Sequence, residues 1–183
     1  PAGHSDVLLG TVSANEATWG RLHDTHIVMG CCAAPDDVYQ VLRGLRTMGV
    51  RLDRHEKSAL ELARWLESRQ EVSRVLHPAL ESHPGHAIWK RDFKGASGLF
   101  SIELKPASKQ ALAAMLDGLE LFGMGFSWGG FESLVTPFNC ASYRTVTEFA
   151  PAGPCLRFHI GLEDPDDLKA DLDAGFTRLR TTV

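Results

Sequence analysis

The sequence lacks several features that would point to common functional classes. No apolar run approaches the roughly 18 residues that a membrane-spanning helix requires, so no membrane partner is predicted. No charged, apolar and small-residue signal segment opens the chain, which makes a cytoplasmic location the expectation. The net charge is −4 and no basic stripe is present, which argues against nucleic acid as a partner.

Motifs for metal and redox chemistry are missing as well. The cysteines are Cys31, Cys32, Cys140 and Cys155. They form no Cys-x-x-Cys pair, so buried reduced thiols are predicted. Two His-x-x-His pairs, which begin at His23 and His83, have no acidic or cysteine companion at ligand spacing. No metal site is therefore predicted.

The composition is that of a globular protein with a sizeable core, since 44% of the 183 residues are hydrophobic and 23% are charged. Residues 6–10 read as a short strand, Asn15 and Pro35 open helices, and a long helix continues to about Gln70. We place the domain boundary there, between residues 1–70 and residues 71–183. Few residues near the first strand could form a second strand to pair with it, so the chain is expected to fold together with another polypeptide.

Residues 71–183 read as α+β. The alternation of apolar residues predicts strands over 99–104, 122–126 and 156–160. A further short strand is predicted over 72–76, closed by Pro78, and another from Leu134. Ser108 and Asp164 are predicted to begin helices with buried leucine stripes. Residues 79–95 are polar and are predicted to be an exposed loop.

Two glycines between aromatics mark the stretch Phe126–Leu134 (FSWGGFESL). A glycine pair allows a left-handed turn or a close approach of the backbone to a ligand. Ser127 offers a hydroxyl there and Trp128 a flat apolar surface. The same residues also suit a simple tight corner after a short strand, so both interpretations stand.

A second candidate lies on the strand Leu156–Asp164 (LRFHIGLED). Leu156, Phe158 and Ile160 alternate, so Arg157 and His159 share the other face. An arginine on a strand can bind a carboxylate through two parallel hydrogen bonds, and the alternative is an ordinary surface ion pair. If Ser127 and Arg157 meet, they would suit the α-carboxylate of an amino acid.

Four blocks of the sequence occur in one order: Gly3–Gly10 (GHSDVLLG), Arg43–Thr47 (RGLRT), the serine-tryptophan-glycine-glycine corner, and Arg157–Glu163. This order resembles the Cys/Met-metabolism family of enzymes that use pyridoxal phosphate (PLP), and in particular its cystathionine β-lyase branch. The resemblance implies the C-terminal part of a fold-type I, aspartate-aminotransferase-like transferase. In that fold, residues 1–70 end the large α/β cofactor domain, and residues 71–183 form a small α+β domain with an antiparallel sheet.

The resemblance also implies a function. The expected reaction is a β-elimination in methionine biosynthesis, from L-cystathionine to homocysteine, pyruvate and ammonia. Ser127, Trp128 and Arg157 would bind the substrate, with Arg157 and Ser127 on its α-carboxylate. Trp128 favours β-elimination over the γ-reactions, with simple packing as the alternative. His4, Ser5 and Asp6 would form structural hydrogen bonds.

The Schiff-base lysine of the family would lie upstream of Pro1, so no catalytic or cofactor-binding residue is assigned within this chain. The six lysines are Lys57, Lys90, Lys94, Lys105, Lys109 and Lys169. None lies in the expected context. The implied partners are therefore the upstream half of the same enzyme, separated by cleavage or by an interruption at a PLP-modified lysine, and further copies in a dimer or tetramer. The chain alone is expected to be inactive.

Two alternatives to the β-lyase remain at this point. One is a sister enzyme, namely cystathionine γ-synthase, cystathionine γ-lyase or methionine γ-lyase. The other is an inactive fragment that acts only in interaction or assembly.

Overall fold

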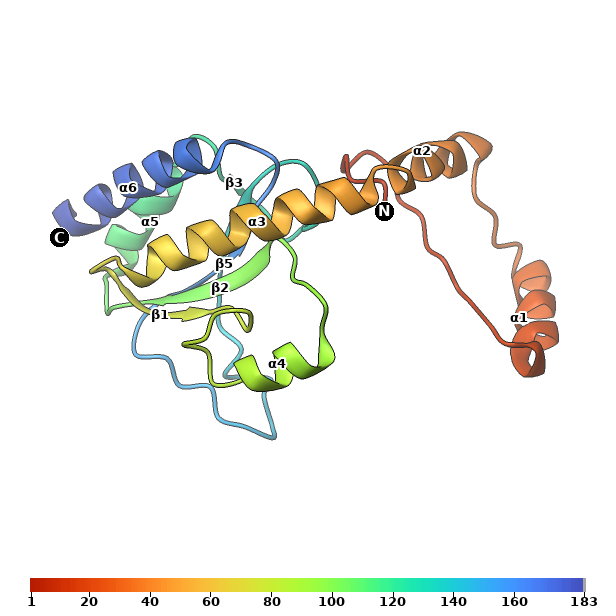
Figure 1. Ribbon diagram of the computed structural model, residues 1–183, viewed down its shortest axis with the longest axis horizontal. Helices are drawn as coiled ribbons and strands as arrows, with labels where there is room; N and C mark the ends of the chain where they lie inside the picture. Colours follow the sequence, from red (N-terminus) through yellow and green to blue (C-terminus); the bar gives the residue numbers. More distant parts are fainter. Residues whose placement is uncertain (183) are drawn as a thin grey trace. The chain divides into compact units, whose positions relative to one another are not determined.

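The chain separates into two compact units, residues 1–49 and residue 50 to the C-terminus, in a computed structural model that describes residues 1–182 (Figure 1). This division falls within helix α3 (Met48–Glu67), whereas the sequence placed the boundary at 70/71. The two positions differ because α3 contributes Ala59, Leu62 and Leu66 to the core of the second unit. The assignment of residues 1–70 to a large cofactor domain and of residues 71–183 to a small domain stays a prediction.

The first unit contains helices α1 (Glu16–Met29) and α2 (Pro35–Leu45). Asn15 caps α1, because its side-chain oxygen accepts the Thr18 N–H at 3.1 Å. Proline in the first turn opens α2, where its missing N–H costs no hydrogen bond. Both predicted helix starts are confirmed.

Residues 1–15, which precede α1, contain no strand, so the strand predicted over 6–10 is wrong. A strand requires a hydrogen-bonded neighbour, and none of the described residues pairs with this segment. Leu8 is accordingly 97% exposed. The backbone of residues 1–2 instead lies against α2 at Gly44, where a Cβ would stand 2.4 Å from the Ala2 oxygen.

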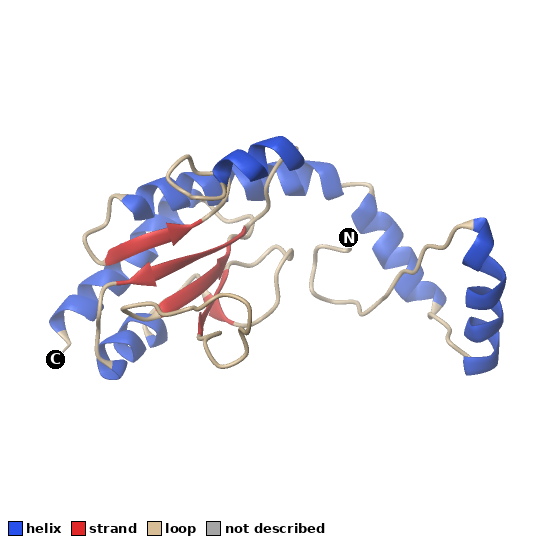
Figure 2. Cartoon of the chain, turned by 90° about the horizontal axis from the view of Figure 1, so that it is seen from below, coloured by secondary structure: helices blue, strands red, loops and turns tan. Residues whose placement is uncertain are grey.

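The second unit is built on one five-stranded sheet with the order β1-β2-β5-β4-β3. Figure 2 shows the strands of this sheet in red and the helices in blue. The strands are β1 (Val72–Leu76), β2 (Leu99–Leu104), β3 (Gly123–Met124), β4 (Leu134–Phe138) and β5 (Cys155–His159). The pairs β1–β2, β2–β5 and β4–β5 are antiparallel, but β3–β4 is parallel. The predicted antiparallel sheet is therefore wrong for β3–β4, because the chain loops out through residues 125–133 and re-enters the sheet in the same direction.

The second unit also contains α4 (His86–Asp92), α5 (Lys109–Asp117) and α6 (Pro165–Thr181). The predicted caps are confirmed, since Ser108 accepts the Ala111 N–H and Asp164 accepts the Asp166 N–H. Helix α4 contradicts the loop predicted over 79–95. The helix was not predicted from the sequence, because none of its residues is buried and it therefore has no apolar stripe. No helix within residues 1–182 is both long and apolar enough to cross a membrane.

The core of the second unit forms where α3, α5 and α6 pack on the sheet. Its largest side chains include Leu62, Leu66, Met115, Leu172 and Phe176 from the helices, and Ile102, Leu156 and Phe158 from the strands. Strand β5 lies at the centre of the sheet, between β2 and β4. Leu156 and Phe158 are fully buried, so the intervening Arg157 is directed away from this core.

The thiols are only partly as predicted. Cys155 is buried, which raises the pKa of its thiol, and Cys140 is half-buried. Cys31 and Cys32 are exposed, so the prediction of buried thiols is wrong for this pair. They lie between α1 and α2, in a segment that buries none of its residues.

Candidate functional site

Arg157 lies in the middle of β5, with Ser101 of β2 and Thr136 of β4 as its neighbours in the sheet. Its Nη2 atom donates to the Phe126 backbone oxygen at 2.5 Å. Its guanidinium carbon also lies 5.9 Å from the centre of the Phe126 ring. The arginine is thereby held next to Ser127, although 31 residues separate the two bonded residues in the sequence.

The charge of Arg157 is not neutralised within the described chain. Among residues 1–182, no aspartate or glutamate oxygen lies within 4.0 Å of its side-chain nitrogens. A guanidinium has five N–H donors, and the bond to Phe126 uses one of them. The remaining donors of this half-buried cation suit an external carboxylate, which favours the binding interpretation over an internal ion pair.

The corner segment, residues 126–133, exposes the side chains of residues 126–128, 131 and 132, whereas Ser133 is buried. Ser127 is exposed, and 64% of the Trp128 surface is accessible. Gly129 has a φ of 83°, which residues with a Cβ rarely adopt, and Gly130 is buried. The glycine pair therefore turns the chain inward just after Trp128, which leaves Ser127 and Trp128 free to contact a ligand.

The buried ring of His159 contacts the backbone of the corner segment. His159 is 3% exposed, and its imidazole faces the Gly129 N–H while its Nε2 lies 3.1 Å from the Gly130 oxygen. Burial is the main cause that holds the pKa of His159 below its usual value. The sequence placed His159 on the face of Arg157 but did not predict this contact.

A serine–glutamate pair holds the end of the corner segment. Ser133 is fully buried, its N–H donates to Glu163 Oε1 at 2.7 Å, and its hydroxyl donates to Glu163 Oε2 at 2.8 Å. The same hydroxyl accepts the Gly161 N–H at 2.8 Å. The Leu162 N–H donates to the Phe131 oxygen at 2.8 Å. The segment that follows β5 thus fixes the segment that carries Ser127, a contact that no local sequence pattern predicted.

Lys169 offers little for a cofactor that binds covalently. Lys169 is already ion-paired, since its ammonium lies 2.6 Å from Glu61 and 2.9 Å from Asp166. These contacts raise its pKa, so the amine stays protonated at neutral pH. The donor set at Arg157 and Ser127 suits a substrate carboxylate and not a covalent cofactor.

At the start of the chain, the ring of His4 lies 2.8 Å from the Ala2 oxygen through Nδ1. Ser5 has a φ of 58°, in the left-handed region. The structural role of residues 4–6 stays a prediction.

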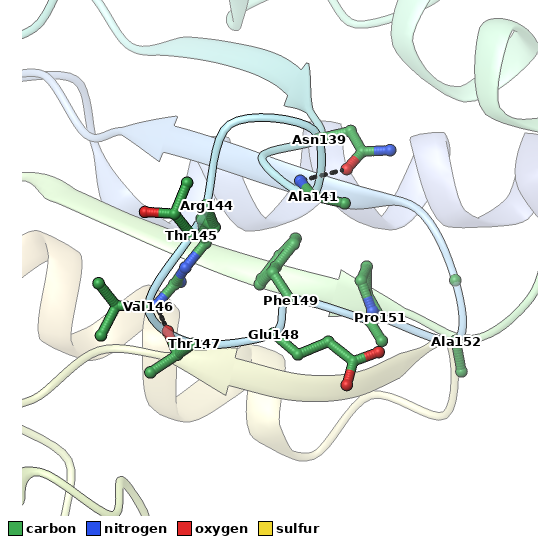
Figure 3. Close-up of a pocket in the computed structure, with 12 residues that line it drawn as sticks. Asn139, Ala141, Arg144, Thr145, Val146, Thr147, Glu148, Phe149, Pro151 and Ala152 are labelled. Carbon is green, nitrogen blue, oxygen red and sulfur yellow. Dashed lines mark hydrogen bonds between the residues drawn. The ribbon is translucent and has the colours of Figure 1, made fainter.

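A separate hollow of about 830 Å³ lies in the 139–153 segment (Figure 3). Arg144 reaches across it, donates to the Thr147 hydroxyl and lies 5.8 Å from the centre of the Phe149 ring. The residues that line this hollow include neither Ser127 nor Arg157. Because neither of the residues selected from the sequence lines this hollow, the candidate site remains the one beside β5.

Comparison with known proteins decides the family. The family model described as "Cys/Met metabolism PLP-dependent enzyme" matches residues 2–177. The chain belongs to this family. PLP is the cofactor of its members, and the predicted fold-type I architecture is confirmed.

Individual relatives agree with this assignment. A protein of Rhizobium johnstonii, provisionally named a cystathionine beta-lyase, is 58% identical over 180 residues, covering 96% of this chain and 45% of its own length. Cystathionine beta-lyase MetC of Escherichia coli is 48% identical over 181 residues, covering 97% and 46%. The crystal structure of cystathionine gamma synthase from Xanthomonas oryzae in complex with cystathionine superposes with a TM-score of 0.85 at 36% identity. This alignment covers 100% of the chain and 48% of that protein.

The relatives do not all carry the same name. A Wolbachia pipientis protein that is 42% identical over 180 residues, covering 97% of this chain and 45% of its own length, is named an L-alanine/L-glutamate racemase. The chain spans just under half the length of these curated relatives. Membership of the family therefore leaves the reaction of the complete protein to be proposed.

Proposed function

We propose that the complete protein is a PLP-dependent carbon–sulfur lyase that converts L-cystathionine to homocysteine, pyruvate and ammonia by β-elimination. In this proposal the present chain supplies the residues that hold the α-carboxylate of the substrate. The supporting observation is Arg157, a half-buried cation that has no carboxylate partner within residues 1–182 and is bonded to the residue before Ser127.

Each residue has a defined task. When bound, PLP withdraws electrons from the Cα atom of an amino acid that is attached to it. Arg157 binds the α-carboxylate with the donors that Phe126 leaves free. Ser127 donates its hydroxyl to the same carboxylate. Two contacts to one carboxylate fix its position and plane, which limits the positions that Cα and its proton can take relative to a base.

Trp128 supports β-elimination as the reaction. Its exposed ring lies directly after Ser127, so it can border the part of the substrate beyond Cα. A bulky ring at this position leaves less room for the substrate than the smaller aliphatic residue that the γ-synthases and γ-lyases of the family usually have there. The name of the Escherichia coli relative points in the same direction.

The proposed partners follow from membership of the family and from the share of its relatives' length that the chain spans. The upstream half of the same protein would supply the Schiff-base lysine, and the full enzyme would assemble as a dimer or tetramer in the cytoplasm. The chain by itself would then be inactive.

Product analysis of the complete protein tests the proposal. With L-cystathionine we expect pyruvate and a free thiol in equal amounts, whereas a γ-lyase would release 2-oxobutyrate. Formation of D-alanine from L-alanine without pyruvate would identify a racemase instead. A colourless preparation without turnover would favour an inactive fragment.

An arginine variant then separates substrate binding from cofactor binding. Arg157→Leu is expected to lose about 100-fold in kcat/KM, because charge-assisted hydrogen bonds worth about 2.7 kcal/mol in total disappear. Its absorbance from bound PLP should persist, since no residue of this chain is assigned to the cofactor. Arg144→Leu, in the separate hollow, is the matched control and should retain activity.

A further inference from the structure

His159 is placed to act on both glycines of the corner segment. The Gly129 N–H lies 3.3 Å from Nδ1 and 3.2 Å from Nε2, while Nε2 lies 3.1 Å from the Gly130 oxygen. A neutral imidazole carries one N–H and one lone pair. It can therefore donate to Gly130 and accept from Gly129 at the same time. An imidazolium has two N–H groups and cannot accept the Gly129 bond.

The surroundings of the ring are built to fit it. Gly98 lies directly against it, and a Cβ there would stand 3.0 Å from the Nδ1 of His159 and 2.4 Å from the Ile160 oxygen. On the side of α3, the ring of His55 lies 5.2 Å from that of His159, centre to centre. His55 is itself fixed, with its Nδ1 2.7 Å from the Ile160 oxygen. The imidazole of His159 therefore has little freedom to move.

Three ionisable groups influence His159, namely His55 from α3, Arg157 from its own strand, and Glu163 after β5. Burial lowers the pKa of His159, and His55 and Arg157 act in the same direction, against the Gly130 carbonyl and Glu163. The ring is thus neutral at pH 7. Because the pKa is lowered, the native ring takes up its proton only below the usual histidine value of about 6.5. At that point the Gly129 N–H loses its acceptor.

We infer that His159 is a positioning residue, whose neutral ring holds the Gly129–Gly130 backbone and thereby fixes Ser127 and Trp128 beside Arg157. Protonation of the ring loosens the corner segment and weakens binding of the substrate carboxylate. The link to catalysis rests on the function proposed above, but the positioning itself does not.

The test compares three variants of the complete enzyme between about pH 5 and pH 9. His159→Gln supplies an amide that can donate and accept as the ring does but does not titrate. His159→Leu fills part of the space without hydrogen bonds. His55→Gln is the control, because it removes the other histidine of the pair. The readouts are kcat and KM for L-cystathionine, and the Trp128 fluorescence obtained as the difference from a Trp128→Phe enzyme.

We expect the wild type and His55→Gln to lose kcat/KM on an acid limb below about pH 6.5, mainly through KM. His159→Gln should lack that limb and keep activity within about threefold at pH 8. His159→Leu removes both bonds to the glycine backbone and should raise KM at least about tenfold at pH 8, a change of about 1.4 kcal/mol, and this difference from the wild type should shrink in acid. The Trp128 signal should titrate in the wild type and not in His159→Gln.

An acid limb that persists unchanged in His159→Gln, or that disappears in His55→Gln instead, would overturn the inference. The fluorescence readout needs no turnover, so it tests the positioning even if the complete protein proves not to be a lyase. A wild type without lyase activity but with a His159-dependent Trp128 titration would refute the proposed function alone.

Discussion

Replacing Ser133 by alanine should loosen the corner segment by a predictable amount. The hydroxyl accepts the Gly161 N–H at 2.8 Å and donates to Glu163 Oε2 at 2.8 Å, and the serine is fully buried. In Ser133→Ala the Gly161 N–H stays buried without an acceptor, which costs about 1–3 kcal/mol. Loss of the bond to a charged carboxylate costs about 1.5–3 kcal/mol in general. Glu163 is half-buried, so water can replace part of that bond.

We therefore expect Ser133→Ala to lower the free energy of local opening by about 2–4 kcal/mol. Amide hydrogen exchange of the complete protein, read on peptides that cover residues 126–133 and 157–163, measures this quantity directly. Protection should fall by about 30- to 800-fold in these peptides, while peptides from β1 stay unchanged. Ser73→Ala, at an exposed position of β1, is the matched control.

The same variant should also reduce kcat/KM, since the corner segment carries Ser127. If exchange in the corner segment matches the wild type within about 0.5 kcal/mol, the Ser133–Glu163 pair does not hold the corner, and the reasoning is wrong.

Two further predictions concern stability. Glu71 is buried, and although burial alone would raise its pKa, backbone bonds and Arg180 lower it. Its contribution is therefore present above about pH 4.5 and is lost as the pH falls through its lowered pKa. Glu71→Gln should cost about 1–3 kcal/mol at pH 7 in urea unfolding, a difference that shrinks in acid. If the wild type and Glu71→Gln differed by the same unfolding free energy at pH 3 as at pH 7, the contribution of Glu71 would not come from its charge. Gly161→Ala should lower Tm by several degrees, because its Cβ would stand 2.2 Å from the Phe131 backbone oxygen. Gly49→Ala should leave Tm unchanged, because no atom lies within 4 Å of the added Cβ. If Gly161→Ala and Gly49→Ala had the same Tm, the close approach of Gly161 to Phe131 would be refuted.

Much of the second unit could be predicted from the sequence because its signals are local. Strand β2 coincides with the alternation of Phe100, Ile102 and Leu104, and β1 lies between the long helix and Pro78 as predicted. Ser108 and Asp164 cap α5 and α6 as the cap preferences predict. Helix α4 was missed for the same reason, since a short surface helix without buried residues has no apolar pattern to read.

The candidate site could be predicted only in part. Residue types identified Arg157 and Ser127, and the structure brings Arg157 to the residue before Ser127. The roles of Ser127, Trp128 and Arg157 in binding stay predictions. The supports His159, Ser133 and Glu163 could not be found, because each acts through a partner about 30 residues away that no local pattern reveals. A signal was nevertheless present in Gly161, a glycine just after a buried strand, which marks a close approach of two backbones.

Recognition of the substrate carboxylate by Arg157 is the central claim, and one ratio tests it most directly. β-Chloro-L-alanine carries a single carboxylate and a leaving group on Cβ, and its α-amide differs only in lacking the charge. For the complete wild-type enzyme, kcat/KM should favour the acid over the amide by about 100-fold, the value of a charge-assisted contact of about 2.7 kcal/mol. In Arg157→Leu this preference should fall below about threefold, with the amide processed nearly as before. An unchanged preference for the acid in Arg157→Leu would contradict the account.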